Sequence, residues 1–375
     1  MMDKTLLPFC RAAALAVLVS CQAAPREPGE ILQASDSDID SIAAHVGAVP
    51  VGGEPFAPRA QLKFPTRIAA VGTKVVLLDA RGDSLVSIFD ARSGELLDAF
   101  GNRLGNPSRD GFSDAWDVAP VAGDTNAFWL LELRNQRLTH VALNSVAEGR
   151  VAQVGRRVEL PGDEPVTGAV QLMDSSFASV GYFTGGRFAY FDPTGRFMRF
   201  VGPVPPGDTS VLVQIRQHAY QSILKSSPDR SQLAVATRHA GHVSIFSSDG
   251  RFIRAAITPS QFEPDYNQEP NAARMILSQN AKIGYLDLAT TERNIFGLFS
   301  GRLLSKKRSH AYSATYIHVF DWYGRLDRVI KLDMDAVAIA VNPVTGILYT
   351  VPRAVEVGLR QYDLAPWPQF SAEKR

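Results

Sequence analysis

The chain has 375 residues, of which 45% are hydrophobic and 21% are charged, so it is long enough for two domains or for one large all-β domain. Its 39 Lys and Arg residues nearly balance its 38 Asp and Glu residues. Because no strong net field attracts polyanions, the composition argues against nucleic acid as a partner.

The first 20 residues have the pattern of a signal peptide. Lys4 and Arg11 precede an apolar run over residues 12–19, which is too short to span a bilayer as a mature helix. The run ends in Leu18-Val19-Ser20-Cys21, which resembles the bacterial lipobox. This pattern predicts cleavage before Cys21 and lipidation of its thiol.

An ordinary secretory signal with an incidental cysteine is the alternative, because Asp3 and Cys10 make the start of the signal irregular. Cys10 and Cys21 are the two cysteines of the chain. The mature protein is therefore expected to hold no disulfide, and packing must stabilise its fold. Buried acyl chains at Cys21 would hold it on a membrane.

Composition divides the chain into four predicted parts. These are a lipoprotein signal peptide (1–20), a lipidated tether and linker (21–50), a β-propeller domain (51–366) and a C-terminal tail (367–375). The start of the tether is short and rich in Pro, Ala and Gly, as in flexible linkers. No later apolar run is long enough to cross a bilayer.

From about Leu62 the chain consists of short alternating runs bounded by Gly, Asp, Asn and Pro, which is typical of β-strands. One hairpin pattern recurs: a strand that ends in Phe-Asp or a similar pair, a turn with Gly, and a second strand. Its copies lie at 85–101, 188–195, 242–250 and 317–324. The aspartate is expected to cap the turn, and the glycine to take a positive φ.

Each hairpin follows two more strand-like runs, which gives four strands in about 40 residues, the size of a propeller blade. On this template the predicted blades are 68–101, 116–160, 166–202, 218–257, 283–332 with an insertion at 303–313, and 336–363. The sixth blade is one strand short. A strand before Thr66, at Gln61–Phe64 or nearer Ile31, is expected to complete it and close the ring.

The predicted fold class is therefore all-β, a six-bladed β-propeller of four-stranded antiparallel blades. A double β-sandwich is the rival fold, and five or seven blades are alternative counts. Repeats of the same internal order favour the ring.

The segment Tyr316–Val351 contains four features in a fixed order. These are a strand that ends in Phe320-Asp321, the turn glycine Gly324, and the runs Ile339-Ala340-Val341 and Leu348-Tyr349. In this order it resembles the TolB-like six-bladed propellers found as lipoproteins in Bacteroidetes and related bacteria. The resemblance extends over about Leu62 to Leu364 and implies the fold and an envelope location. Its motifs are structural, so it implies no catalytic residue.

The sequence contains few candidate catalytic or metal-binding residues. His239 and His242 have a spacing that could suit a metal, but the spacing alone is a weak signal and a polar turn is the favoured interpretation. His318 and His140 lie in alternating strands, and we expect His318 to face away from Ile317 and Val319. There is no Gly-x-Ser-x-Gly motif.

Some propeller enzymes bind a calcium-type ion on the central axis through acidic side chains of several blades. Glu132, Asp174 and Asp287 lie near strand ends and are the candidates for such a site. Acidic residues at such positions more often cap a turn or lie on a solvated edge. The cofactor prediction is accordingly none, with an axial divalent metal as the alternative.

One basic cluster, Arg302–His310, lies in the insertion of the fifth blade and could contact phosphate head groups or an acidic partner. A solvated loop is the simpler interpretation.

These patterns together predict a lipid-anchored protein of the bacterial cell envelope, on the outer membrane and facing the periplasm or the cell surface. We expect a monomer that binds a protein, peptide or glycan through its loops without catalysis. A hydrolase or lyase with an axial metal is the second hypothesis.

Overall fold

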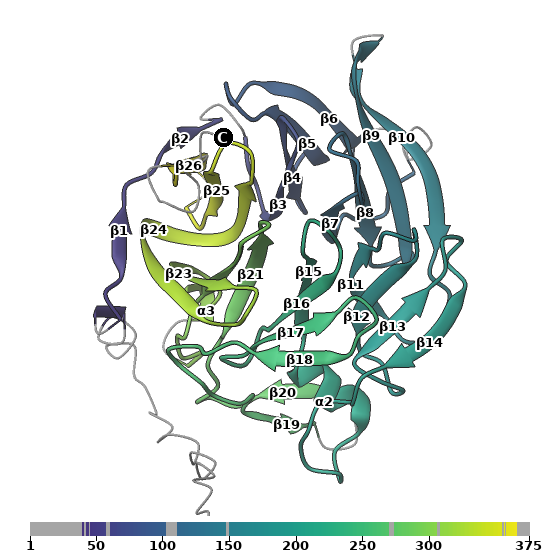
Figure 1. Cartoon of the computed structure of the whole chain (residues 1–375), viewed down its shortest axis with the longest axis vertical. Helices are drawn as coiled ribbons and strands as arrows, with labels where there is room; N and C mark the ends of the chain where they lie inside the picture. The colour runs from purple at the N-terminus through teal and green to yellow at the C-terminus, as the bar shows by residue number, and fades with distance from the viewer. Residues whose placement is uncertain are drawn as a thin grey trace, which may run out of the picture. The chain divides into compact units, whose positions relative to one another are not determined.

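A computed structural model describes residues 40, 43–44, 46–57, 61–102, 111–147, 150–269, 274–305, 308–354, 356 and 358–365, except for the side chains of 102, 144–147, 150 and 308. The chain divides into two units, residues 1–32 and 33–375, and every described residue belongs to the second. The described residues are mostly β-strand, arranged as a ring of blades (Figure 1).

Blade 1 shows how the repeated pattern folds. It consists of β3 (Pro65–Val71), β4 (Lys74–Asp79), β5 (Ser84–Asp90) and β6 (Leu96–Asn102), paired antiparallel in chain order. At the turn between β5 and β6, Asp90 Oδ1 accepts hydrogen bonds from the backbone N–H groups of Arg92 (3.0 Å) and Ser93 (2.8 Å). Gly94 closes this turn with φ 71°, a conformation that favours glycine. The predicted capped hairpin is confirmed.

Blades 2, 3 and 4 repeat this order of four antiparallel strands. Blade 2 is β7 (Asp117–Pro120), β8 (Ala127–Glu132), β9 (Arg137–Ala147) and β10 (Arg150–Glu159). Blade 3 is β11 (Val166–Gln171), β12 (Phe177–Gly181), β13 (Phe188–Phe191) and β14 (Phe197–Val201). Blade 4 is β15 (Ser222–Ser226), β16 (Gln232–Thr237), β17 (Val243–Ser247) and β18 (Phe252–Ala255).

Blades 5 and 6 are joined in one eight-stranded sheet because they share a strand. Blade 5 is β21 (Tyr285–Thr290), β22 (Asn294–Phe299), β23 (Ala314–Asp321) and the first part of β24 (Leu326–Asn342). The second part of β24 pairs with β25 (Ile347–Pro352), which pairs with β26 (Leu359–Asp363). The 17 residues of β24 therefore form the outer strand of blade 5 and the inner strand of blade 6.

The ring is closed by a strand from the start of the domain, as expected, but not by either segment that the sequence suggested. β2 (Glu54–Phe56) pairs antiparallel with β26 and supplies the missing fourth strand of blade 6. Gln61–Phe64 instead lies in the link that leads to β3, and the region near Ile31 is outside the described residues. The side chain of Phe56 anchors β2 in blade 6, because it packs on Tyr349 with ring centroids 4.8 Å apart.

A further strand precedes β2. β1 (Val49–Val51) pairs in parallel with residues 330–332 of β24, and Ala43 packs with Tyr316 and Val329. The Tyr316 hydroxyl donates a hydrogen bond to Asp40. The end of the segment that composition assigned to the tether thus packs against blade 5.

Apolar side chains fill the spaces between neighbouring blades. His318 illustrates the alternation: it stacks on Phe299 at 4.5 Å, whereas Ile317 and Val319 belong to the core cluster shared by blades 5 and 6. The prediction that His318 faces away from its two neighbours is confirmed. Because both faces of the blade are covered, all three side chains are buried.

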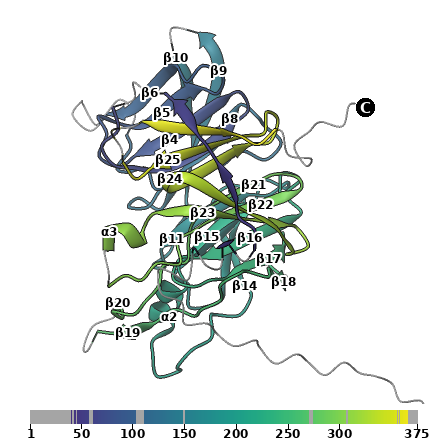
Figure 2. The same cartoon turned by 90° about the vertical axis from the view of Figure 1, so that its left-hand side faces the viewer.

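The connections between blades carry the small additional elements. These are α2 (Val213–Ala219) before blade 4, the hairpin of β19 (Tyr266–Gln268) and β20 (Met275–Leu277) before blade 5, and α3 (Arg308–Ala311) inside blade 5. They lie on one side of the ring, on the left in Figure 2. We call this side the connection face, and the opposite side, with the turns between first and second strands, the turn face. No helix among the described residues is long and apolar enough to cross a membrane.

Candidate functional site

The innermost strands of the blades line the axis of the ring, and four of them carry a charged side chain. Arg67 lies on β3, Asp117 on β7, Lys225 on β15 and Asp287 on β21. Asp117 Oδ1 lies 3.5 Å from Lys225 Nζ and 3.7 Å from Arg67 Nε. Blades 1, 2 and 4 are thereby linked across the axis. We call these four residues the charged layer.

Asp287 is held mainly by backbone groups. Its Oδ1 accepts a hydrogen bond from Leu288 N (2.9 Å) and its Oδ2 one from Ile339 N (3.0 Å), which ties blade 5 to blade 6. Burial raises the pKa of Asp287, and the nearby positive charges of Arg67 and Lys225 oppose that rise. Both carboxylate oxygens are therefore already engaged by the fold.

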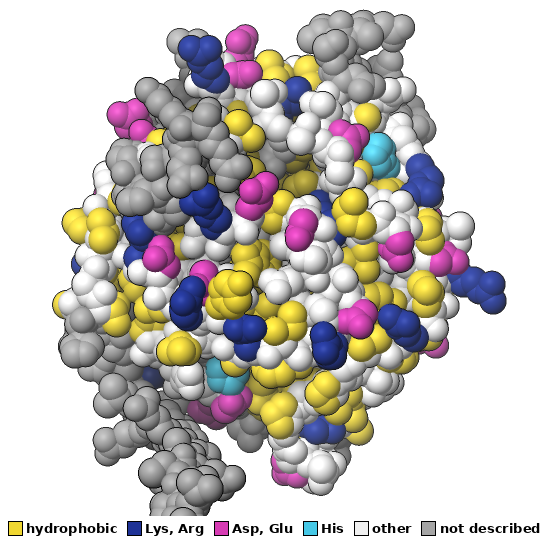
Figure 3. Space-filling model, viewed as in Figure 1, with side chains coloured by type: hydrophobic (Ala, Val, Ile, Leu, Met, Phe, Trp, Pro, Cys, Tyr) yellow, Lys and Arg dark blue, Asp and Glu magenta, His cyan; other side chains and the backbone are white. Residues whose placement is uncertain are grey.

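A funnel leads from the turn face toward the charged layer. Its volume is about 320 Å³, and every blade contributes to its wall. In blade order, one lining residue from each is Val71, Val121, Val170, Pro228, Thr290 and Val344. Figures 1 and 3 look onto this face, where hydrophobic side chains surround the centre (yellow in Figure 3).

The lining of the funnel is mostly apolar, and its polar members include Asp124, Thr125 and Asn342 as well as the cations Lys225 and Arg230. Val344 is 86% exposed, an unusual exposure for a valine. Lys225 is paired with Asp117, and Arg230, in the turn between β15 and β16, donates hydrogen bonds to the carbonyl oxygens of Pro120 (3.0 Å) and Val121 (3.3 Å). Both cations are therefore held in place by the protein, and Asp117 offsets the charge of Lys225.

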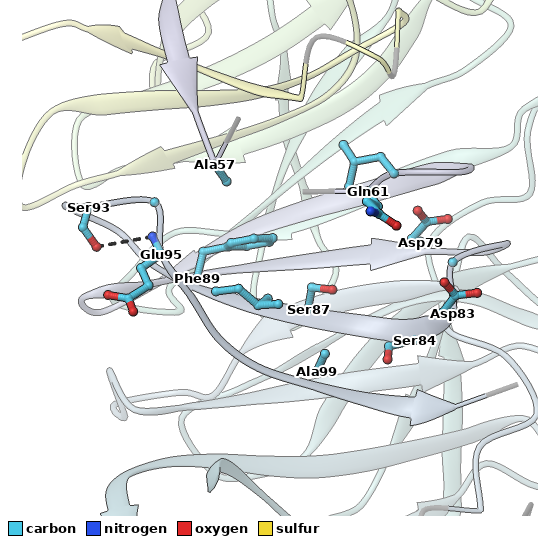
Figure 4. Close-up of a pocket in the computed structure, with 14 residues that line it drawn as sticks. Ala57, Gln61, Asp79, Asp83, Ser84, Ser87, Phe89, Ser93, Glu95 and Ala99 are labelled. Carbon is cyan, nitrogen blue, oxygen red and sulfur yellow. Dashed lines mark hydrogen bonds between the residues drawn. The ribbon is translucent and has the colours of Figure 1, made fainter. Parts of the chain in front are cut away.

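A second cavity, of about 790 Å³, lies beside the outer strands of blade 1 (Figure 4). Phe89, Leu96 and several small residues line it, together with Asp79, Asp83 and Glu95. Asp79 accepts hydrogen bonds from three backbone N–H groups, and Asp83 is paired with Lys63. Two of the three acids therefore stabilise the local fold.

The three acids suggested for an axial metal lie in different environments. Glu132 is fully buried on β8 and pairs with Arg137 at 2.8 Å, and it also accepts a hydrogen bond from the Thr139 hydroxyl. Asp174 caps the turn between β11 and β12 through Ser176 N (3.0 Å). Only Asp287 belongs to the charged layer. The structure thus does not bring Glu132, Asp174 and Asp287 together.

The histidines also separate. His239 Nδ1 lies 3.0 Å from the Ala219 carbonyl oxygen, whereas His242 Nε2 lies 3.3 Å from Glu263. Burial lowers the pKa of His239 to about 4. His318 Nδ1 is 3.0 Å from the Tyr285 hydroxyl, and His140 lies edge-on to Trp129. Within the described part of the chain, no group of three or more His, Cys, Asp or Glu residues has the arrangement of a metal site.

The basic cluster provides fewer free charges than its sequence indicated. Arg302 forms a two-pronged ion pair with Asp335, at 2.9 and 2.8 Å, and also donates to backbone carbonyl oxygens. This arginine serves to hold the insertion of blade 5. Lys306 and Lys307 lie outside the described residues, as does the predicted lipidation site Cys21.

Sequence reasoning missed Arg67, Asp117 and Lys225. A signal was present, because each is an ionisable residue inside a short, otherwise mostly uncharged first strand of a blade. Applied blade by blade, that observation would have selected the charged layer, since first strands face the axis.

The closed ring of four-stranded antiparallel blades around a central axis defines the chain as a six-bladed β-propeller. A family profile described as "TolB-like 6-blade propeller-like" matches residues 54–343, so the chain belongs to this family. The resemblance inferred from Tyr316–Val351 is confirmed. A search of curated proteins found no significant match.

Several solved structures share the fold at low sequence identity. One is a member of the DUF4221 family from Bacteroides vulgatus, with a TM-score of 0.52 and 11% identity, covering 83% of this chain and 95% of that one. Another is a structural genomics protein of unknown function from Bacteroides thetaiotaomicron, with a TM-score of 0.50 and 12% identity, covering 85% of this chain and 73% of that one. Chaetomium thermophilum Raptor has the same score and identity, covering 86% of this chain and 29% of its own. These similarities show the fold alone.

Proposed function

We propose that this chain is an envelope lipoprotein whose propeller binds a protein or peptide segment in the turn-face funnel without chemical turnover. The funnel carries this proposal, because it is the place where all six blades converge and where a mostly apolar lining includes two cations held in place by the protein, Lys225 and Arg230. Binding sites are commonly concave and largely apolar, with a few fixed polar groups that orient the ligand.

The lining favours a peptide over a glycan. No aromatic residue is among the described residues that line the funnel, whereas Val71, Val121, Val341 and Val344 are. Aliphatic walls suit apolar side chains, and a sugar would leave many hydroxyl groups without partners there. An apolar segment that carries an acidic group would match the valine lining and the cation Arg230.

Site-specific crosslinking tests the binding site. A photoreactive phenylalanine analogue at position 344 of the full-length protein should crosslink a defined protein in the cell envelope, identified by mass spectrometry. The Val121→Glu change places a charge in the same funnel, two blades away from Val344, and should abolish this product. An analogue at Ile257, which is 69% exposed and lies at the connection between blades 4 and 5, is the matched control.

The proposal fails if positions 344 and 257 give the same products, or if Val121→Glu leaves the crosslink unchanged. It also fails if the purified full-length protein shows metal-dependent turnover across ester, lactone and glycoside substrates. That second result would favour the hydrolase or lyase hypothesis.

The membrane location is a separate part of the proposal and rests on the sequence around Cys21. Lipid chains contribute about 0.8 kcal/mol per buried CH₂ group, so their loss should release the protein. We expect Cys21→Ala to move the protein from the membrane fraction to the soluble envelope fraction. Cys10→Ala is the control, and unchanged membrane retention of Cys21→Ala would contradict the anchor.

A further inference from the structure

The outer strands of blades 3 and 4 expose large apolar side chains to solvent. On β14 these are Phe197, Met198 and Phe200, and on β18 the exposed residue is Phe252. The rings of Phe197 and Phe200 lie with their centroids 4.7 Å apart, so they form one surface. Exposed apolar side chains that gather in this way commonly mark an interaction site.

Two contacts join the outer edges of blades 3, 4 and 5. The Tyr190 hydroxyl of blade 3 donates a hydrogen bond to the Ser248 carbonyl oxygen, in the turn before β18, at 2.7 Å. Between blades 4 and 5, Ile257 N donates to the Gly324 carbonyl oxygen at 2.9 Å. Ile257 and Tyr323 are themselves exposed and extend the apolar surface to blade 5. We call six residues the apolar belt: Phe197, Met198, Phe200, Phe252, Ile257 and Tyr323.

Arginines occupy matching positions in the outer strands of blades 3 and 4. After the turn glycine, blade 3 continues with Arg196–Arg199 (RFMR) and blade 4 with Arg251–Arg254 (RFIR). The same four positions of blade 1 are Glu95–Asp98 (ELLD). The hairpin therefore accepts either sign of charge at its first and fourth positions, and the turn itself does not require the arginines.

The charges of these arginines are not neutralised by ion pairs. Arg196 and Arg251 are exposed, and Arg199 lies over the Tyr190 ring, 5.3 Å from its centroid. In the described part of the chain, no carboxylate lies within ion-pair distance of Arg196, Arg199, Arg251 or Arg254. A contact with an aromatic ring orients a guanidinium group but leaves its charge in place.

The neighbouring acids do not cancel this charge. Asp192, Asp249 and Asp321 cap the turns that begin these outer strands, by accepting backbone N–H groups. Arg325 pairs with Asp321, so five arginines stand against three aspartates. Glu159, which lies beside the turn of blade 3, is paired within blade 2. The apolar belt is therefore flanked by excess positive charge.

We propose that the apolar belt and its arginines form a contact surface for an anionic phospholipid membrane. Apolar and aromatic side chains enter the boundary between head groups and acyl chains, and guanidinium groups bind lipid phosphates. The belt lies on outer strands rather than in a cavity, which suits a fluid lipid surface. A second copy of the chain would oppose arginine to arginine, which charge repulsion disfavours. The contact requires neither the turn-face funnel nor the proposed anchor at Cys21.

A dye at a single site tests whether the belt enters the membrane. The full-length protein with Cys10→Ala and Cys21→Ala has no thiol and no lipid anchor, so Phe252→Cys in that background can be labelled with nitrobenzoxadiazole. We expect a blue shift of its emission with vesicles of equal parts phosphatidylcholine and phosphatidylglycerol, and a smaller shift with phosphatidylcholine alone. Leu96→Cys is the matched control, because Leu96 has the equivalent position in blade 1 and is 55% exposed, compared with 54% for Phe252.

Substitutions in the same background test the charges and the apolar side chains separately. In vesicle sedimentation, Arg196→Gln with Arg251→Gln should weaken binding to the anionic vesicles by about 10- to 30-fold. Phe252→Ser should weaken it by about 5- to 10-fold. Arg92→Gln with Arg134→Gln, at exposed arginines of blades 1 and 2, is the control that should bind as the parent protein does. All these side chains are exposed, so the melting temperatures should stay unchanged.

The proposal is overturned if the dye at position 252 shows no shift with anionic vesicles, or the same shift as the dye at position 96. Binding that the Arg196 and Arg251 changes leave intact would also overturn it, because the apolar run of residues 12–19 would then account for the contact. A dimer in the absence of vesicles that Phe252→Ser dissociates would make the belt an interface between copies of the chain and would contradict the proposal as well.

Discussion

Asp117 Oδ1 and Lys225 Nζ lie 3.5 Å apart and join blade 2 to blade 4, two blades that are separated in the ring by blade 3. The contact therefore crosses the axis. Both side chains are largely buried, with 10% and 15% of their surface exposed, so solvent screens the pair weakly.

Removing the charge of Asp117 should destabilise the fold. Asp117→Asn leaves Arg67 and Lys225 facing each other without a counter-charge, and we expect a loss of about 3 kcal/mol in the free energy of unfolding. Urea denaturation measures this quantity. The control is Asp83→Asn, because Asp83 forms an exposed pair with Lys63, whose loss should cost less than about 1 kcal/mol. Equal losses in the two variants would show that the axial position of Asp117 is unimportant.

Glu132 should act as a structural acid. Its carboxylate accepts hydrogen bonds from Arg137, Thr139 and the Ser113 backbone. Glu132→Gln leaves the guanidinium group of Arg137 without its charged partner, so we expect a loss of about 3 kcal/mol. The melting temperatures of this variant and of the parent protein should not respond to a chelator or to added calcium. A chelator effect on the parent protein that Glu132→Gln removes would instead make Glu132 a metal ligand.

Closure of the ring should depend on Phe56. Its side chain is 2% exposed and lies between Tyr349 of blade 6 and Phe89 of blade 1. Phe56→Ala should lower the free energy of unfolding by about 3 to 5 kcal/mol, because it leaves a cavity where the first and last blades meet. Phe197→Ala, at a phenylalanine that is 41% exposed on the outer strand of blade 3, is the matched control and should cost much less.

Buried His318 should make stability depend on pH. Burial lowers its pKa to about 3 in the folded protein, compared with about 6.5 in an unfolded chain. Between these values only the unfolded chain binds the proton. The contribution of His318 to the free energy of unfolding is therefore fully present above about pH 6.5. It is lost as the pH falls toward 3, by at most about 1.4 kcal/mol per pH unit.

The His318→Phe variant isolates this contribution. Its free energy of unfolding, measured by denaturant titration between pH 7.5 and 4.5, should fall less steeply than that of the parent protein. Tyr285→Phe removes the hydroxyl beside His318 but keeps the histidine, so it should retain the steep slope. Parallel curves for His318→Phe and the parent protein would contradict the assigned burial effect.

Features that depend on neighbouring residues were predicted correctly, whereas features that join distant parts of the chain were not. The caps of the hairpin turns were predictable because Asp90, Asp192 and Asp321 bind backbone groups two to four residues further along the chain. The closing strand was harder to predict. Glu54–Phe56 is too short to show alternation, and its partner, β26, lies about 300 residues away in the sequence.

By itself, the sequence determined the all-β class, the hairpin repeat and the blade size, because turn chemistry and alternating side chains act locally. Only the tertiary structure decided which charges of the axial channel pair with one another. Arg67, Asp117, Lys225 and Asp287 come from four separate blades, and nothing in their local sequence determines which charges will meet. Their proximity follows from closure of the ring, which directs every first strand toward one axis.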